Sequence, residues 1–211
     1  MSGKRSSRSS KPSSDAERRV AEKPLRIIGG NFRGRHLLYS GDLRTRPMKD
    51  RVREAVFNLL GRAVRDTHAI DMFAGTGALG LEAVSRGAVS ATFIEQHFPT
   101  ARIIEQNAAA LQVTPQTSVV AASVFAWVCR QPWQGLPAQP WTVFCSPPYD
   151  FYVERQEEML SLIRTVHEHS PPQSWFVVEA DGRFDFQLLA PLGEWDVRNY
   201  PPSAVGIHRR E

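Results

Sequence analysis

The sequence predicts an α/β protein with a mainly parallel central sheet, helices on both faces of that sheet and an N-terminal β-hairpin extension. From residue 68 onward, short apolar runs alternate with segments whose apolar residues recur at helical spacing, which is typical of βαβ units. The first of these runs leads directly into a glycine-rich turn and a helical segment. The 211 residues, of which 42% are hydrophobic, suffice for one domain with a substantial core.

The N-terminal third has a different pattern. Two β-prone runs within residues 25–39 flank Gly29-Gly30-Asn31, with arginines interleaved, and they predict a small hairpin with a cationic face. Apolar residues then recur at helical spacing and predict a helix that ends near Gly61. On that helix we expect Arg51 and Arg53 to point away from the buried side, free to contact phosphate.

The main domain is expected to contain five strands, four helices and two further edge strands. The strands are placed at 68–73, 90–95, 117–121, 141–145 and 174–179. The helices are placed at 77–86, 98–111, 122–130 and 152–168, and the edge strands at 184–190 and 195–207. The chain is thereby divided into a disordered basic tail (1–24), an extension of hairpin and helix (25–65) and the main domain (66–211).

Positive charge is concentrated in the first third of the chain, although the net charge is only +4. Residues 1–24 carry seven Lys/Arg and three Asp/Glu, residues 25–65 carry ten and three, and residues 66–211 carry nine and sixteen. This asymmetry indicates a polyanionic partner that meets the N-terminal part. For the Ser-rich tail, a solvated segment that promotes solubility is an equally good interpretation.

Several protein classes are disfavoured by the composition. No run approaches the ~20 apolar residues of a membrane helix, and the start MSGKRSSRSSKPSS lacks the apolar region of a secretory signal. We therefore expect an intracellular, cytoplasmic protein that does not contact membranes. Cys129 and Cys145 are too few for a disulfide framework, and both are expected to be small core residues.

The turn after the first strand has the spacing of a ligand-binding turn. Gly75, Gly77 and Gly80 fit G-x-G-x-x-G, which lets the backbone turn tightly and approach a ligand at a helix N-terminus. Glu95 ends the next strand, twenty positions after Gly75, where a carboxylate accepts hydrogen bonds from both ribose hydroxyls. The pattern alone fits a dinucleotide or another adenosine-containing cofactor.

A second unusual stretch, Ser146-Pro147-Pro148-Tyr149, follows the apolar run at 141–145. The prolines fix φ and lack N–H groups, so they hold a polar side chain, rigid carbonyls and an aromatic ring beyond a strand. Asp71, at the start of the glycine turn, would attract a cationic amino-acid group and repel a pyrophosphate. Together these features match S-adenosylmethionine-dependent amino-methyltransferases, in which Asp, Asn or Ser followed by Pro-Pro-aromatic receives the target base.

A longer ordered set of motifs resembles the RsmD family. The set comprises RIIGG and RGR (26–30, 33–35), RP (46–47), DRVRE and FN (50–54, 57–58), Asp71, FAGTGALGLEA (73–83), SRGA (85–88) and IE (94–95). The match is dense from Arg26 to Glu95, returns at the Pro-Pro loop and becomes thin after about residue 155. The resemblance implies a Rossmann-like methyltransferase fold and methylation of the exocyclic N2 of a guanine in small-subunit (16S) ribosomal RNA.

The resemblance also implies the residues of the cofactor site, with the methionine part facing Asp71 and the glycine turn, the ribose on Glu95 and the adenine along Gln96. The full expected set is Asp71, Phe73, Ala74, Gly75, Gly77, Ala78, Glu95, Gln96, Ser123 and Ser146. The family usually carries Asn or Asp at the position of Ser123 and Asp at the position of Ser146. The segment at 198–202 is only loosely similar to the family's ending. We expect no metal ion.

The expected catalytic group is Ser146, Pro147, Pro148 and Tyr149. The amine of guanine is a poor nucleophile because its lone pair is delocalised into the ring. Ser146 Oγ and the Pro147 carbonyl would accept its two N–H groups and orient the lone pair toward the methyl group. Tyr149 would stack on the base, which must be unstacked or flipped to be reached.

The expected partner is small-subunit ribosomal RNA, free or within an assembling subunit, bound by a monomeric protein. RNA contacts are assigned to Arg26, Arg33, Arg35, Arg46, Arg51 and Arg53. Two alternatives stay open. Because Ser146 carries no charge, the chain could be a catalytically weakened RNA-binding protein of the same fold. Because phosphate contacts do not distinguish RNA from DNA, a DNA or protein amino-methyltransferase is also compatible with the sequence.

Overall fold

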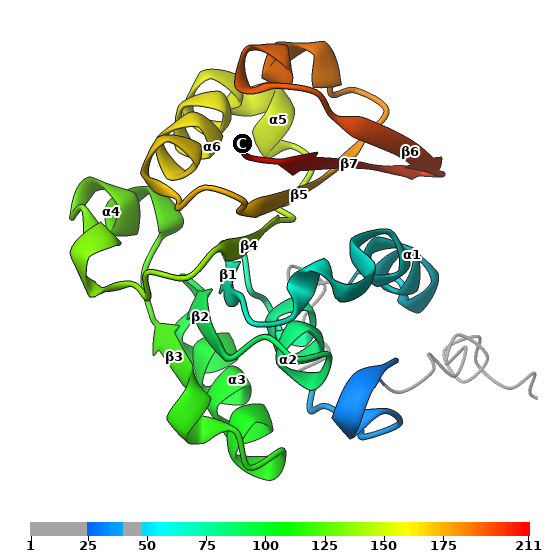
Figure 1. The fold of residues 1–211 in the computed structure, drawn as a ribbon, viewed down its shortest axis with the longest axis vertical. Coiled ribbons are helices and arrows are strands. Elements are labelled where there is room, and N and C mark those ends of the chain that lie inside the picture. Colours follow the sequence, from blue (N-terminus) through cyan, green and yellow to red (C-terminus); the bar gives the residue numbers. More distant parts are fainter. Residues whose placement is uncertain (1–24, 40–47) are drawn as a thin grey trace, which may run out of the picture.

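The structure is a computed structural model that describes residues 25–39 and 48–211. Strands and helices alternate along the main domain (Figure 1). The strands are β1 (His68–Asp71), β2 (Ser90–Ile94), β3 (Thr117–Val120), β4 (Trp141–Cys145), β5 (Trp175–Asp181), β6 (Asp196–Tyr200) and β7 (Ser203–Arg209). The α-helices are α1 (Asp50–Leu60), α2 (Ala78–Ser85), α3 (Phe98–Ala110), α4 (Val124–Cys129), α5 (Phe151–Glu154) and α6 (Gln156–His169).

The strands form one sheet in the order β3-β2-β1-β4-β5-β7-β6. Strands β1 to β5 are parallel, and β7 runs antiparallel between β5 and β6. The strand order reverses direction between β1 and β4, and open α/β sheets bind ligands outside the carboxyl ends of the strands at such a point. The predicted α/β class with a mainly parallel sheet is confirmed, and each of the five predicted strands corresponds to one of β1 to β5.

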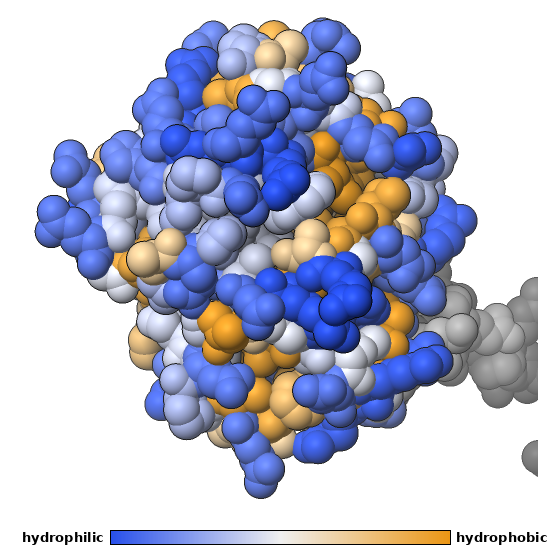
Figure 2. All heavy atoms as spheres, in the orientation of Figure 1, coloured by the Kyte–Doolittle hydropathy of each residue, from blue (hydrophilic) through white to orange (hydrophobic). Residues whose placement is uncertain are grey.

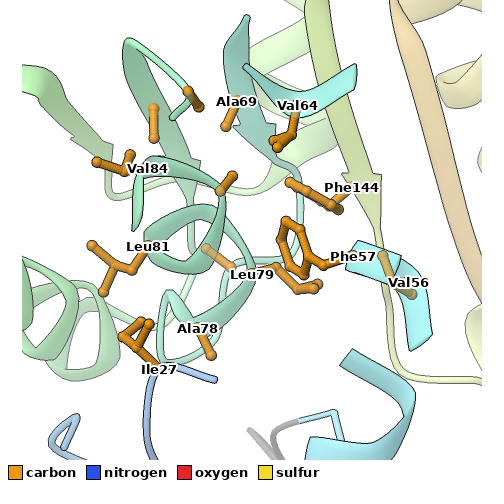
Figure 3. Packing of buried hydrophobic residues seen from close by; sticks show 14 of the residues in the cluster. Ile27, Val56, Phe57, Val64, Ala69, Ala78, Leu79, Leu81, Val84 and Phe144 are labelled. Atoms are coloured by element: carbon orange, nitrogen blue, oxygen red, sulfur yellow. The ribbon is translucent and has the colours of Figure 1, made fainter. Parts of the chain in front are cut away.

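Helices cover both faces of the sheet. Successive side chains along a strand point to opposite faces, and on each face they pack with helices in one hydrophobic cluster. Ala69 and Phe144 join the cluster that contains α1, α2 and α3, whereas Ile70 and Val143 join the cluster that contains α4 and α6. In the first cluster, the rings of Phe57 and Phe144 lie 5.6 Å apart between centroids (Figure 3). On the outside, hydrophilic residues cover most of the visible face, with hydrophobic residues in smaller patches (Figure 2).

The N-terminal hairpin is present but shorter than predicted. Residues 25–39 form one isolated antiparallel bridge, Arg26 to His36, around a 3-10 turn at Gly30–Phe32. Hydrogen bonds of 2.9 Å from Ile27 N to Arg35 O and from Leu37 N to Leu25 O flank this bridge, and the backbone at the turn binds α2. Ile28 N and Gly29 N each lie 2.7 Å from a carboxylate oxygen of Glu82. The segment therefore docks onto the main domain through side chains of α2.

The C-terminal part also differs from the prediction. The segment expected as an edge strand at 184–190 contains a 3-10 helix, Phe186–Leu192, because the Asp185 side chain accepts a hydrogen bond from Gln187 N and caps the turn. The segment at 195–207 supplies two strands, β6 and β7, which are separated at Pro201-Pro202. Prolines lack the N–H that a continuing strand would need.

The two cysteines differ in burial. Cys145 is buried as predicted, but Cys129 at the end of α4 is exposed, so the core assignment was wrong for that residue. Helix α4 buries Val124 and Trp127, and Cys129 lies away from this buried side of the short helix.

Within the described ranges of the chain, no helix is both long and apolar enough to cross a membrane.

Candidate functional site

A cavity of about 770 Å³ lies at the carboxyl ends of the central strands. It is bounded by the turn after β1, the end of β2, the start of α4 and the loop after β4. The predicted site residues that line it are Phe73, Ala74, Gly75, Ala78, Glu95, Gln96, Ser123, Ser146, Pro147, Pro148 and Tyr149. Two residues of the predicted cofactor site, Asp71 and Gly77, do not line the cavity. The glycine turn and the proline loop, about 70 positions apart in the sequence, thus face the same space.

The glycine turn requires glycine at two positions. Gly75 and Gly77 have φ angles of 51° and 78°, in the left-handed region that a side chain disfavours. A Cβ at Gly77 would also lie 2.9 Å from Cγ2 of Ile104 on α3. The turn closes with a 2.7 Å hydrogen bond from Gly77 N to Ala74 O. This compact turn places the first residues of α2 against the cavity.

Glu95 joins the glycine turn to the end of β2. Its side chain is buried, with Oε2 accepting a 2.9 Å hydrogen bond from Gly75 N and Oε1 accepting a 2.7 Å hydrogen bond from His97 N. A carboxylate oxygen can accept more than one hydrogen bond, so Glu95 retains acceptor capacity toward the cavity that it lines. The arrangement suits a ligand with hydroxyl donors.

Asp71 lies behind the glycine turn. Its Oδ2 accepts a 3.1 Å hydrogen bond from Gly80 N, while Oδ1 is buried and has no hydrogen-bond partner among the described residues. Burial raises the pKa of Asp71 to about 7, and the charge of Glu95 adds to that rise while the hydrogen bond from Gly80 opposes it. A cation that approached this carboxyl would favour its ionised form.

The proline loop is anchored to a carboxylate on the neighbouring strand β5. Ser146 Oγ and the Tyr149 hydroxyl donate to the two oxygens of Glu179, the second bond being 2.9 Å long. Tyr149 OH also lies 2.7 Å from Ser203 Oγ of β7. Burial raises the pKa of Tyr149 to about 12, and the nearby Glu179 charge contributes to the rise.

The sequence interpretation missed Glu179 and Ser203, which both line the cavity. One signal for Glu179 was available, because it follows the apolar run Phe176–Val178 in β5, the strand beside β4, and Ser146 follows β4 directly. It also missed Phe125 and Phe151, whose rings lie 6.4 Å and 6.1 Å from that of Phe73. These three rings form an apolar wall suited to a flat aromatic ligand.

The predicted arginines lie in different environments. Arg33, Arg35 and Arg51 are exposed, and the Arg26 side chain is 51% exposed. Arg53 was expected to face phosphate, and that prediction is wrong. Its side chain is fully buried and Nη2 donates to Arg26 O (2.6 Å) and Asp50 Oδ1 (3.0 Å). The reason is that residues 25–39 cover this side of α1. Arg46 lies outside the described residues.

The chain is similar to known proteins in both sequence and fold. A model of the family described as Conserved hypothetical protein 95 matches residues 25–200. The chain is 39% identical over 125 residues to "Ribosomal RNA small subunit methyltransferase D" of Escherichia coli (strain K12), covering 59% of this chain and 60% of that relative. It is 35% identical over 136 residues to the protein of the same name from Haemophilus influenzae, covering 64% and 69%. The match thus spans about 60% of the Escherichia coli relative's length.

Solved structures are similar over a larger share of the chain. The hypothetical protein TTHA0928 of Thermus thermophilus is 28% identical, with a TM-score of 0.67 over 87% of this chain and 98% of that one. An RNA methyltransferase from Salinibacter ruber, solved with S-adenosyl-L-homocysteine, has a TM-score of 0.58 over 78% and 94%. At 14% identity the second likeness shows the fold alone.

Proposed function

The chain belongs to the Conserved hypothetical protein 95 family, and we propose that it is an S-adenosylmethionine-dependent methyltransferase acting on small-subunit ribosomal RNA. The family membership confirms the predicted resemblance to the RsmD family. We further propose that the modified atom is the exocyclic N2 of a guanine. The observation that carries the proposal is that the glycine turn, Glu95 and the Ser146–Tyr149 loop line one cavity. The names of the curated relatives support the same activity.

The donor set around the glycine turn fits S-adenosylmethionine. Glu95 would accept hydrogen bonds from the ribose hydroxyls, and Gln96 and Ser123 would hold the adenine. Asp71 would supply negative charge for the cationic amino-acid part, and its buried Oδ1 has no partner among the described residues. When bound, the cofactor supplies a methyl group on a sulfonium, and the bond from target nitrogen to methyl carbon forms as the carbon–sulfur bond breaks with its electron pair on sulfur.

The proline loop receives the target base. Ser146 Oγ and the Pro147 carbonyl accept the N–H groups of the exocyclic amine and hold its lone pair in the direction of transfer. Tyr149 stacks on the base, a contact worth ~1–3 kcal/mol in single-strand complexes. The hydroxyl of Tyr149 is bonded to Glu179 and Ser203, so the hydroxyl end of the side chain is held in place before the base arrives.

The N-terminal extension binds RNA beside the cavity. Met48 and Lys49 line the cavity, and Lys49 directly precedes α1. The exposed Arg51 lies on α1, close to this edge of the cavity, and the exposed Arg33 lies on the segment 25–39 that docks on α2. Both supply contacts to phosphate. We propose that a monomer binds small-subunit ribosomal RNA, free or in an assembling particle, in the cytoplasm. Contacts by Arg26, Arg35 and Arg46 are part of the same proposal.

Methyl transfer to defined substrates tests this function. The purified full chain is incubated with labelled S-adenosylmethionine and, separately, with small-subunit ribosomal RNA, assembled small subunits, DNA and protein. RNA is then digested to nucleosides, and mass spectrometry detects N2-methylguanosine. Glu95→Ala should weaken cofactor binding, whereas Glu158→Gln on the exposed side of α6 serves as the matched control. Label on DNA or protein, or RNA binding without transfer, would support one of the two alternatives instead.

A further inference from the structure

Glu179 is a buried carboxylate at the cavity, and its bonding partners are hydroxyl groups. It is 4% exposed, lies between the buried apolar residues Val178 and Ala180 of β5, and lines the cavity. Within the described part of the chain, Glu179 forms no ion pair with a cationic side chain. Its hydrogen bonds come from the hydroxyls of Ser146 and Tyr149. A buried charge without a cation is costly, which indicates that a positive charge meets Glu179 at some stage of function.

The contact with Glu179 sets the direction of the Ser146 hydroxyl. Since Ser146 has one proton and donates it to Glu179 Oε2, the lone pairs of its oxygen are left to accept from a ligand. Both residues line the same cavity. A hydrogen bond to an ionised acceptor polarises the hydroxyl and makes its oxygen a stronger acceptor in turn. Ser146 and Glu179 therefore act as one extended acceptor with a negative charge at its far end.

We propose that Glu179 is a positioning residue for the target amine, acting through Ser146 and supplying the negative charge that a serine at this position lacks. This inference rests on the proposed function of the cavity. The exocyclic nitrogen gains positive charge as it takes up the methyl group, so a fixed negative charge on its side of the cavity stabilises the transition state more than the ground state.

The hydrogen bond between Ser146 and Glu179 also provides a path for the proton that the nitrogen must lose after methyl transfer. The proton passes from the nitrogen to Ser146 Oγ while the hydroxyl proton of Ser146 moves to Glu179 Oε2. Serine is thereby regenerated, the product amine is neutral and Glu179 is left protonated until it exchanges with solvent. The other oxygen of Glu179 keeps Tyr149 in place, so one carboxylate positions both the acceptor and the stacking ring.

Replacing Glu179 by glutamine tests this role, because the amide keeps the shape and hydrogen-bonding capacity but removes the charge. Glu179→Gln should lower kcat by roughly 10²-fold, by analogy with the loss of one preorganised transition-state contact, while cofactor affinity measured by calorimetry stays unchanged. Adding Ser146→Asp to this variant should restore much of the rate. Asp181→Asn, two residues further along β5 and ion-paired with Arg183, is the matched control and should keep the wild-type rate.

A second readout needs neither cofactor nor RNA. The Tyr149 phenol, followed by NMR of ¹³C-labelled tyrosine and assigned with Tyr149→Phe, should titrate at lower pH in Glu179→Gln because the neighbouring charge is gone. An unmoved Tyr149 titration, or a Glu179→Gln variant as fast as an active wild type, would overturn the inference alone. A wild type that methylates no RNA would contradict the proposed function and with it the inference.

Discussion

Replacing Glu82 by alanine should destabilise the protein strongly, because this fully buried carboxylate joins the N-terminal extension to α1 and α2. Its Oε1 accepts from Gly29 N at 2.7 Å and from Arg86 Nε at 2.8 Å, and its Oε2 accepts from Ile28 N at 2.7 Å. Oε2 also lies 3.9 Å from Nε of Arg53, whose side chain is likewise fully buried. Removing the carboxylate leaves a buried guanidinium with only the Asp50 carboxylate as an ion-pair partner among the described residues.

The expected magnitude follows from that geometry. Removing one partner of a buried ion pair costs ~3–5 kcal/mol. For a chain of this size each kcal/mol lowers Tm by ~2–4 °C, so Glu82→Ala should melt ~6–20 °C below the wild type. Thermal and urea unfolding measure the change, with Glu158→Ala of the exposed pair Arg155–Glu158 as control. A Glu82→Ala protein with the same Tm as the control would show that the contacts of Glu82 do not hold the extension in place.

Three further predictions concern the site. Glu95→Ala should weaken S-adenosylmethionine binding, at ~1.5–3 kcal/mol per hydrogen bond lost to the charged acceptor; calorimetry measures this, and an unchanged affinity would place the ribose elsewhere. Arg33→Gln and Arg51→Gln should each make the slope of log affinity for RNA against log salt concentration shallower by about one unit, with cofactor affinity unchanged. Filter binding at several salt concentrations measures this slope, and an unchanged slope would contradict the prediction. Burial raises the pKa of Asp71 to about 7, so the native state binds an extra proton between the unfolded value of ~3.9 and about 7, and the free energy of unfolding should fall as pH rises through that window. Asp71→Asn should flatten this fall in urea titrations, and an equally steep fall in the variant would assign it to another group.

Much of the main domain was predictable because its signals are local. Apolar runs at 68–73 and 141–145 marked central strands, and Gly75 and Gly77 marked a turn whose φ angles the structure places in the left-handed region. The cavity wall followed from these strands, since parallel strands end at the same edge of a sheet.

The errors arose where long-range contacts decide the structure. Helical spacing placed Arg53 on an outer side of α1, but the covering extension and the carboxylates of Asp50 and Glu82 bury it. The same carboxylate of Glu82 accepts hydrogen bonds from backbone N–H groups next to the turn of the short hairpin. Glu179 was missed because its hydrogen-bond partner Ser146 lies 33 positions earlier in the chain. No local pattern contains that pair.

Mass spectrometry of small-subunit ribosomal RNA from cells with and without the gene for this chain tests the central claim most directly. The account predicts one guanine that carries N2-methylation in the presence of the gene and is unmodified without it. The gene with Glu179→Gln should leave that guanine mostly unmodified, and the gene with Asp181→Asn should restore it fully. Ribosomal RNA with the same methylated guanines in both strains would contradict the account.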